Sequence, residues 1–146
     1  MKNATILILS LVVLIGCQKE KQEEPSLQDM LLGRWNVISY TGVFPSDITP
    51  TEFLFPNDKF VLDFDLNKYG TGKCLWFYSS PSFTPTHYYV KFYDFSLNED
   101  TKKLELSEPS NSTIRVLSID INGDELILNS PKEGDFTNVT YTAERE

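Results

Sequence analysis

The feature that most constrains the fold of this chain is an alternation of apolar and polar side chains that begins at Gly33 and continues to the C-terminus. A two-residue period places successive side chains on opposite faces of a β-strand, and no stretch of ten residues here keeps a helical period instead. Enrichment in β-branched and aromatic residues marks eight candidate strands. These strands are Arg34–Thr41, Lys59–Leu66, Thr71–Tyr78, Tyr88–Phe95, Lys103–Ser107, Thr113–Ile121, Glu125–Asn129 and Thr137–Glu144.

The segments between the strands carry turn chemistry. Asn98-Glu99-Asp100 and Asn122-Gly123-Asp124 predict hairpins, because Asn and Gly adopt positive φ at low cost. Gly70-Thr71-Gly72 predicts a tight strand start or a bulge. Short strands joined by such turns are typical of a barrel or a sandwich. The chain has 146 residues with ten Phe, seven Tyr and two Trp, which is enough apolar area for the core of a single domain.

The alternation also predicts which side chains face the interior. In the strand from Thr71 the prediction is open, because Cys74, Trp76 and Tyr78 compete with Leu75 and Phe77. An eight-stranded barrel has an interior that side chains either fill or leave wide enough for one small ligand. In the other strands, the residues predicted to face inward are Trp35, Val37, Phe60, Leu62, Phe64, Val90, Phe92, Leu104, Leu106, Leu126, Leu128, Val139 and Tyr141.

The N-terminus carries the strongest motif. An apolar run from Ala4 to Ile15 has the length of a secretory signal and is too short to span a bilayer. It ends in Leu14-Ile15-Gly16-Cys17, which resembles the lipobox of bacterial lipoproteins. That resemblance implies cleavage before Cys17, acylation of Cys17 and attachment to a membrane through the acyl chains, of which two or more anchor a protein stably. The alternatives are an ordinary signal peptide or an uncleaved anchor.

These features divide the chain into three parts. We expect a signal peptide over residues 1–16, a flexible tether over 17–30 and a barrel domain over 31–146, with Leu27 to Leu32 forming a helical turn that plugs one end of the fold. Gln18 is not the aspartate associated with retention in the inner membrane, so the expected location is the outer membrane of the cell envelope, on its periplasmic face or at the cell surface. The polar run after Cys17 is either a spacer or a signal for surface display.

A second resemblance concerns the domain itself. Gly33-Arg34-Trp35 resembles the Gly-X-Trp opening of the lipocalin family, and the Gly70-Thr71-Gly72 turn and the segments 114–128 and 139–145 resemble bacterial lipocalin-like lipoproteins. The likeness covers nearly all of residues 31–145, apart from two long proline-bearing loops, 44–57 and 79–86. It implies a single eight-stranded antiparallel up-and-down β-barrel with Trp35 closing one end, and a small apolar or amphipathic ligand.

Charge and cysteine content narrow the function classes. The formal net charge of −8 argues against a nucleic-acid partner, which needs a basic face. With Cys17 acylated, Cys74 is a lone thiol, which we expect in the core rather than in a disulfide or a reactive site.

No catalytic residue, cofactor or metal is predicted. His87 is the only histidine and has no evident nucleophile beside it. Asp120, Asn122 and Asp124 have the spacing of the first ligands of a calcium loop, but the required glycine and the distal glutamate are missing, so a hairpin turn accounts for them better. We therefore expect a protein that is not an enzyme.

Two functions remain after these exclusions. The first is binding of a small hydrophobic ligand, with the ligand-binding residues expected to be Trp76, Tyr78, Tyr89, Phe64 and Phe92. The alternative is a protein-interaction or envelope accessory role for the barrel-rim loops Tyr40–Phe55 and Tyr78–Tyr89, in which prolines stiffen exposed aromatic residues. The sequence does not identify the protein partner that such a role requires.

Overall fold

A computed structural model gives the fold of the protein and describes residues 24–45, 47, 49, 51–54, 57–66, 72–81, 87–110 and 113–146, without the side chains of 87 and 88. The expected signal peptide (1–16), the lipobox with Cys17 and the first part of the tether lie outside the described residues. So do Phe55, the Gly70-Thr71 pair and residues 82–86. No helix among the described residues is long and apolar enough to cross a membrane.

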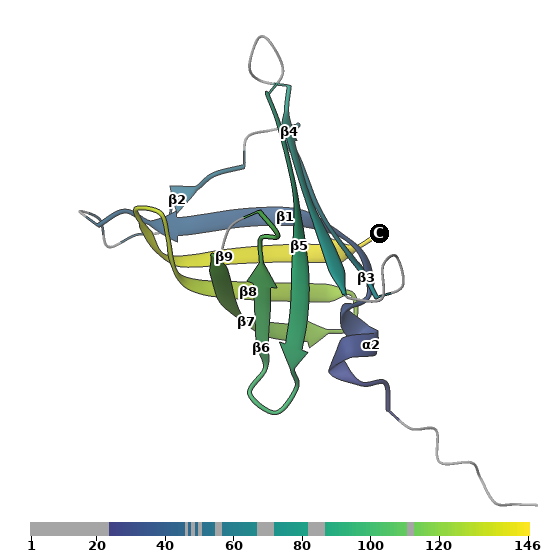
Figure 1. Cartoon of the computed structure of the whole chain (residues 1–146). Helices are drawn as coiled ribbons and strands as arrows, with labels where there is room; N and C mark the ends of the chain where they lie inside the picture. Colours follow the sequence, from purple (N-terminus) through teal and green to yellow (C-terminus); the bar gives the residue numbers. More distant parts are fainter. Residues whose placement is uncertain are drawn as a thin grey trace, which may run out of the picture.

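The chain forms a closed, eight-stranded, antiparallel up-and-down β-barrel with one additional short strand, β2 (Thr51–Glu52), which confirms the predicted barrel (Figure 1). Strands adjacent in the barrel are consecutive in the chain apart from β2, and pairing of β1 with β9 closes the barrel. The barrel strands are β1 (Gly33–Val43), β3 (Lys59–Asp65), β4 (Lys73–Ser80), β5 (His87–Asn98), β6 (Lys103–Ser107), β7 (Ile114–Asn122), β8 (Glu125–Glu133) and β9 (Phe136–Arg145).

The predicted alternation places most side chains correctly. The inward set of β1, β3, β6, β8 and β9 is buried as expected, and Cys74 and Trp76 resolve the open prediction for β4. The prediction for β5 is wrong, because Val90 and Phe92 are 51% and 60% exposed on the outer face. Over Tyr88–Phe95 each face carries three apolar or aromatic residues and one charged residue, Asp94 or Lys91, so alternation alone could not choose between them. The described residues of β5 that are buried in the core are Tyr93 and Phe95.

One end of the barrel is closed by α2 (Leu27–Leu31), the helical turn expected from the sequence. Ser26 and Asp29 form a capping box at its start, and Leu31 is fully buried. The indole N–H of Trp35 donates to the Leu31 carbonyl at 2.8 Å.

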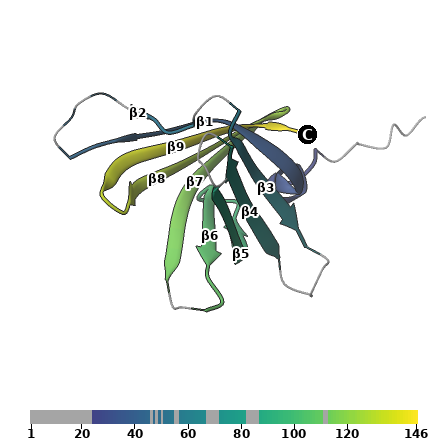
Figure 2. The same cartoon turned by 90° about the horizontal axis from the view of Figure 1, so that it is seen from above.

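Arg145 completes the closed end from β9. Its guanidinium lies 4.2 Å from the centre of the Trp35 ring and donates to the backbone carbonyls of Met30 and Leu32. These contacts join the first and last described elements of the chain, α2 and β9. The helix α2 and the strand β2 lie at opposite ends of the molecule (Figures 1 and 2), so the second end carries β2 and the β8–β9 turn.

Candidate functional site

A pocket of about 340 Å³ opens at the end of the barrel opposite α2. Seven of its nine lining residues carry aromatic rings, and the other two form an ion pair. A ring-lined hollow with a few polar groups is the usual form of a small-molecule site. The lining residues are Tyr40, Phe53, Phe60, Trp76, Tyr78, Tyr89, Arg115, Glu133 and Tyr141.

A β-bulge brings Tyr40 into this pocket. The register of β1 against β9 shifts by one residue between Val37 and Ser39, which leaves Ile38 as the extra residue. Before the bulge Trp35 and Val37 face inward, and after it the even-numbered positions do. Tyr40 then stacks on Tyr141, with ring centres 4.6 Å apart and planes 8° from parallel.

A second irregularity brings in Glu133. Along β8 the alternation of buried and exposed residues breaks after Ser130, at Pro131, whose facing residue Asn138 has φ of 50°. The Ser130 hydroxyl donates to the Lys132 carbonyl at 3.0 Å across this break. Beyond it Lys132 faces the solvent and Glu133 turns toward the barrel interior, its side chain 13% exposed.

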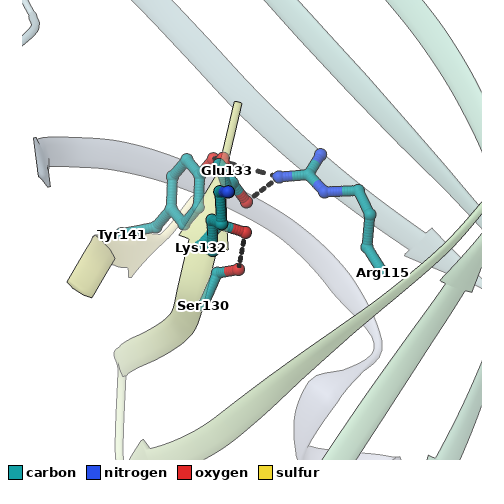
Figure 3. Close-up of polar contacts among 5 residues, drawn as sticks. All are labelled: Arg115, Ser130, Lys132, Glu133 and Tyr141. Carbon is teal, nitrogen blue, oxygen red and sulfur yellow. Dashed lines mark hydrogen bonds and ion pairs between the residues drawn. The ribbon is translucent and has the colours of Figure 1, made fainter. Parts of the chain in front are cut away.

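Arg115, Glu133 and Tyr141 form the polar centre of the pocket (Figure 3). The Nη2 group of Arg115 pairs with Glu133 and also donates to the Tyr141 hydroxyl at 3.2 Å, and that hydroxyl donates to Glu133 in turn. Burial raises the pKa of Tyr141 well above its ordinary value, so the hydroxyl stays protonated and available as a donor.

The polar centre is held against aromatic rings. The Arg115 guanidinium lies 4.3 Å from the centre of the Trp76 ring, in the range of a cation–π contact. Trp76 and Phe60 each meet Tyr141 edge-on, at 5.2 and 5.8 Å between ring centres. Movement of Arg115 out of the pocket would therefore break both a ring contact and an ion pair, which holds the side chain in place.

The segment around β2 covers one side of the pocket. Phe53 donates its N–H to the Tyr40 carbonyl at 2.7 Å, and its ring packs on Phe136 and Tyr40. The carboxylate of Glu52 accepts from the Ser39 hydroxyl and from the N–H groups of Tyr40 and Leu54. Partial burial of Glu52 opposes ionisation, but these hydrogen bonds outweigh it and lower the pKa of its carboxyl group.

A second cation, Lys91, lies at the same end of the interior. Its ammonium group pairs with Glu108 at 2.9 Å and lies 5.7 Å from the centre of the Tyr89 ring. The hydrogen bond from Lys91 to Glu108 is the main cause of its raised pKa. On the neighbouring strand β4, the Tyr78 hydroxyl donates to Asp58 at 2.7 Å.

The structure brings together three of the five expected ligand-binding residues: Trp76, Tyr78 and Tyr89. Phe64 is buried further toward the closed end, where it meets Phe95 edge-on at 5.4 Å, and it is not among the lining residues of this pocket. Phe92 faces outward and cannot contribute to an interior site.

Sequence reasoning missed Tyr40, Arg115 and Glu133 as pocket residues. Strict alternation placed Tyr40 outside, since it does not anticipate the bulge at Ile38. Pro131 was an available signal, because a proline within a strand marks an edge or an irregularity. Arg115 stands between Ile114 and Val116, and a charged residue in such a position is ordinarily solvent-facing.

Of the remaining candidates, Cys74 and the turn residues Asp120, Asn122 and Asp124 are not among the described lining residues of the pocket. Cys74 is fully buried, and burial raises the pKa of its thiol well above the ordinary value, as in an unreactive core cysteine. His87 begins β5, and its side chain lies outside the described part of the chain. Asn122 and Glu125 pair across the β7–β8 hairpin turn, where Gly123 has φ of 62°.

A larger groove of about 530 Å³ lies on the outer surface where β1 and β3 diverge. It is lined in part by Arg34, whose guanidinium pairs with Asp63 and Glu146. We place the candidate site in the smaller interior pocket, because its rings converge on one buried ion pair and the groove has no comparable centre.

No known protein family matches the chain, and comparisons with curated proteins and with solved structures give no significant match.

Proposed function

We propose that this protein is a non-catalytic binding module that holds a small amphipathic molecule at the open end of its barrel. The observation that carries the proposal is the pocket of about 340 Å³, in which seven aromatic residues surround the Arg115–Glu133 pair. The rings offer apolar surface with little conformational freedom to lose, and the ion pair offers donors and an acceptor at one point. This arrangement suits a ligand with a flat apolar body and one polar group.

Binding rather than catalysis is favoured by the chemistry of the lining. The polar groups that face the pocket are the side chains of Arg115 and Glu133 and the hydroxyls of tyrosines. Tyr141 is a donor held protonated by burial and cannot serve as a base near neutral pH. Among the side chains that the structure describes, the lining contains neither a serine or cysteine nucleophile nor a histidine base.

The test uses two residues of one strand that lie on opposite faces. Tyr89 lines the pocket, while Phe92 is 60% exposed on the outer face. We expect Tyr89→Ala to weaken binding of N-phenyl-1-naphthylamine, an uncharged fluorescent aromatic, about tenfold, the equivalent of one lost ring contact. Phe92→Ala should leave the affinity unchanged. Equal effects, or no binding by the parent protein, would contradict the proposal.

A complementary measurement looks for the natural ligand. The protein is purified from its own host, and material bound to it is extracted and identified by mass spectrometry. We expect a small molecule that co-purifies with the parent and with Phe92→Ala but is depleted from Tyr89→Ala. A barrel that is empty in every preparation would count against a binding function.

We also propose that the module is an envelope lipoprotein attached through acyl chains on Cys17. The support is the Leu14-Ile15-Gly16-Cys17 motif and the polar stretch that follows it. The chain enters the barrel through α2 at the closed end, so a tether from Cys17 leaves the pocket at the end away from the attachment point. Metabolic labelling with an alkynyl fatty acid should label the parent protein and not the Cys17→Ala variant. On cell fractionation, the parent should be found with the membranes and the variant in the fraction without membranes.

A further inference from the structure

The polar centre of the pocket carries no net charge. Arg115 and Glu133 neutralise each other, and Tyr141 hydrogen-bonds to both. The side chains of Arg115 and Glu133 are 23% and 13% exposed, so water screens this ion pair only in part. A ligand that reaches this point therefore meets a strong local dipole rather than a positive or negative site.

The other charged groups at this end add no unpaired positive charge. Lys91 is paired with Glu108, whose side chain is 17% exposed, and Asp58 accepts a hydrogen bond from the Tyr78 hydroxyl. Among the charged side chains described around the pocket, each cation thus has a carboxylate within ion-pair distance. Nothing in this set offers an incoming anion an uncompensated positive charge.

The physical consequence concerns what the pocket can hold. A carboxylate or an ammonium group must lose water to enter a ring-lined space, and that cost is recovered only against an opposite charge. Here an anion is attracted by Arg115 but repelled by Glu133. A cation is attracted by Glu133 but repelled by Arg115.

The desolvation free energy of an uncharged polar group is much smaller, and Arg115 can donate a hydrogen bond to such a group. Arg115 carries five N–H donors, and its contacts with Glu133 and Tyr141 use the Nη2 group. Within the described part of the chain, this leaves the Nε and Nη1 groups for other acceptors, such as the hydroxyl of the nearby Tyr93 or an oxygen of the ligand.

We propose that the pocket selects aromatic ligands whose polar group is uncharged, such as a carboxamide or a hydroxyl, over the same ring bearing a carboxylate or an ammonium group. This inference rests on the proposed binding function and adds the class of ligand. The Arg115–Glu133 pair is the selecting element: its dipole receives a neutral donor and acceptor, and its lack of net charge disfavours either ion.

The test compares three probes that share one ring system and differ in charge: indole-3-acetamide, indole-3-acetate and tryptamine. Binding of each to the full chain in detergent is measured by isothermal titration calorimetry at neutral pH. We expect the amide to bind at least about tenfold more tightly than either ion, a modest fraction of the cost of an unpaired buried charge. Equal affinities, or a tighter ion, would overturn the inference and leave the binding function standing. If none of the three binds while N-phenyl-1-naphthylamine does, the inference fails alone; if no aromatic probe binds, both fail.

Variants make the mechanism testable. Glu133→Gln leaves Arg115 unneutralised, and we expect the preference to move to indole-3-acetate by about tenfold. Glu144→Gln removes a carboxylate from the exposed face of β9 and should leave the preference for the amide intact. The double variant Arg115→Gln/Glu133→Gln restores zero net charge, so the amide should again be preferred over both ions. A Glu133→Gln protein that keeps the parent's order of affinities would exclude the pair as the selecting element.

Discussion

Each end of the barrel contains an arginine that lies against a tryptophan ring, but the two arginines have different hydrogen-bond partners. At the closed end Arg145 lies 4.2 Å from the Trp35 ring centre, and at the open end Arg115 lies 4.3 Å from that of Trp76. Arg145 donates to backbone carbonyls of the α2 segment, which fixes the chain in place. Arg115 instead meets the side chains of Glu133 and Tyr141, beside an open pocket. The contact of an arginine with a tryptophan does not by itself define a role; the acceptors that the arginine meets do.

The largest expected effect comes from removing the ring at the closed end. Trp35 is fully buried and donates to Leu31, so Trp35→Ala should reduce the free energy of unfolding by ~3–5 kcal/mol through the cavity and the lost hydrogen bond. Urea denaturation followed by circular dichroism measures this loss. Phe92→Ala, on the exposed outer face, serves as the control and should change stability by no more than ~0.5 kcal/mol. A loss of similar size in both variants would contradict the role of Trp35 in closing the barrel.

The second prediction separates the two arginines. Arg145→Met leaves the Met30 and Leu32 carbonyls without this donor and should cost ~2 kcal/mol of stability, with the affinity for indole-3-acetamide unchanged. Arg115→Met should weaken binding of that amide about tenfold, because the donors that face the pocket are lost. Denaturation and calorimetry on both variants provide the comparison. If Arg145→Met impaired binding as strongly, the two ends would not be functionally distinct.

The third prediction is that acid pH weakens the structure at the open end of the barrel and leaves the closed end unchanged. Because the folded protein lowers the pKa of Glu52, ionised Glu52 stabilises the fold above its ordinary value of 4.5. That contribution disappears as the pH falls through the lowered value. The hydrogen-exchange protection of the Tyr40 and Leu54 amides, taken relative to their intrinsic exchange rates at each pH, should therefore fall at low pH, while α2 and the Trp35 indole stay protected. In Glu52→Gln the protection of these amides should already be lower near neutral pH, and unchanged protection in that variant would rule out the Glu52 carboxylate as the group that holds them.

The closed end was more predictable from the sequence than the open end, for a physical reason. The closed end follows regular rules: Trp35 obeys the two-residue alternation, and Ser26 with Asp29 gives a readable helix start. The open end depends on breaks in regularity. Tyr40 reaches the pocket only because Ile38 is inserted as a bulge, and Glu133 only because alternation fails at Pro131. Such breaks are decided by the packing of the whole barrel, which a single strand's pattern does not contain.

The choice of face in β5 failed for a different reason. Val90 and Phe92 are as apolar as Tyr93 and Phe95. Over the predicted strand the charged residues are divided between the faces, Asp94 on one and Lys91 on the other, so neither face is marked as the outside. The register with β4 decides the matter, because Tyr93 is paired with buried Cys74 and Phe92 with half-buried Leu75. Trp76, Tyr78 and Tyr89 could be anticipated because the aromatic residues near the β4–β5 connection share one face.

The smallest expected effects come from a matched pair of glycines, one near each end. A Cβ atom added to Gly72 would lie 2.9 Å from the ring of Phe95, and one added to Gly42 would lie 2.9 Å from the ring of Phe53. Phe95 is 9% exposed and has little room, so Gly72→Ala should cost ~1–2 kcal/mol of stability and leave probe binding unchanged. Phe53 is only half-buried and its ring can move, so Gly42→Ala should cost less than ~1 kcal/mol.

The informative readout of Gly42→Ala is binding rather than stability. Phe53 forms part of the pocket wall, so its displacement should change the dissociation constant of N-phenyl-1-naphthylamine by about threefold or more, a shift that a sub-kilocalorie change in one ring contact can produce. Gly72→Ala is the control for a general loosening of the barrel. If both variants changed binding equally, the barrel would transmit strain between its ends. If only Gly42→Ala does, the open end adjusts independently of the end that α2 and Trp35 hold closed.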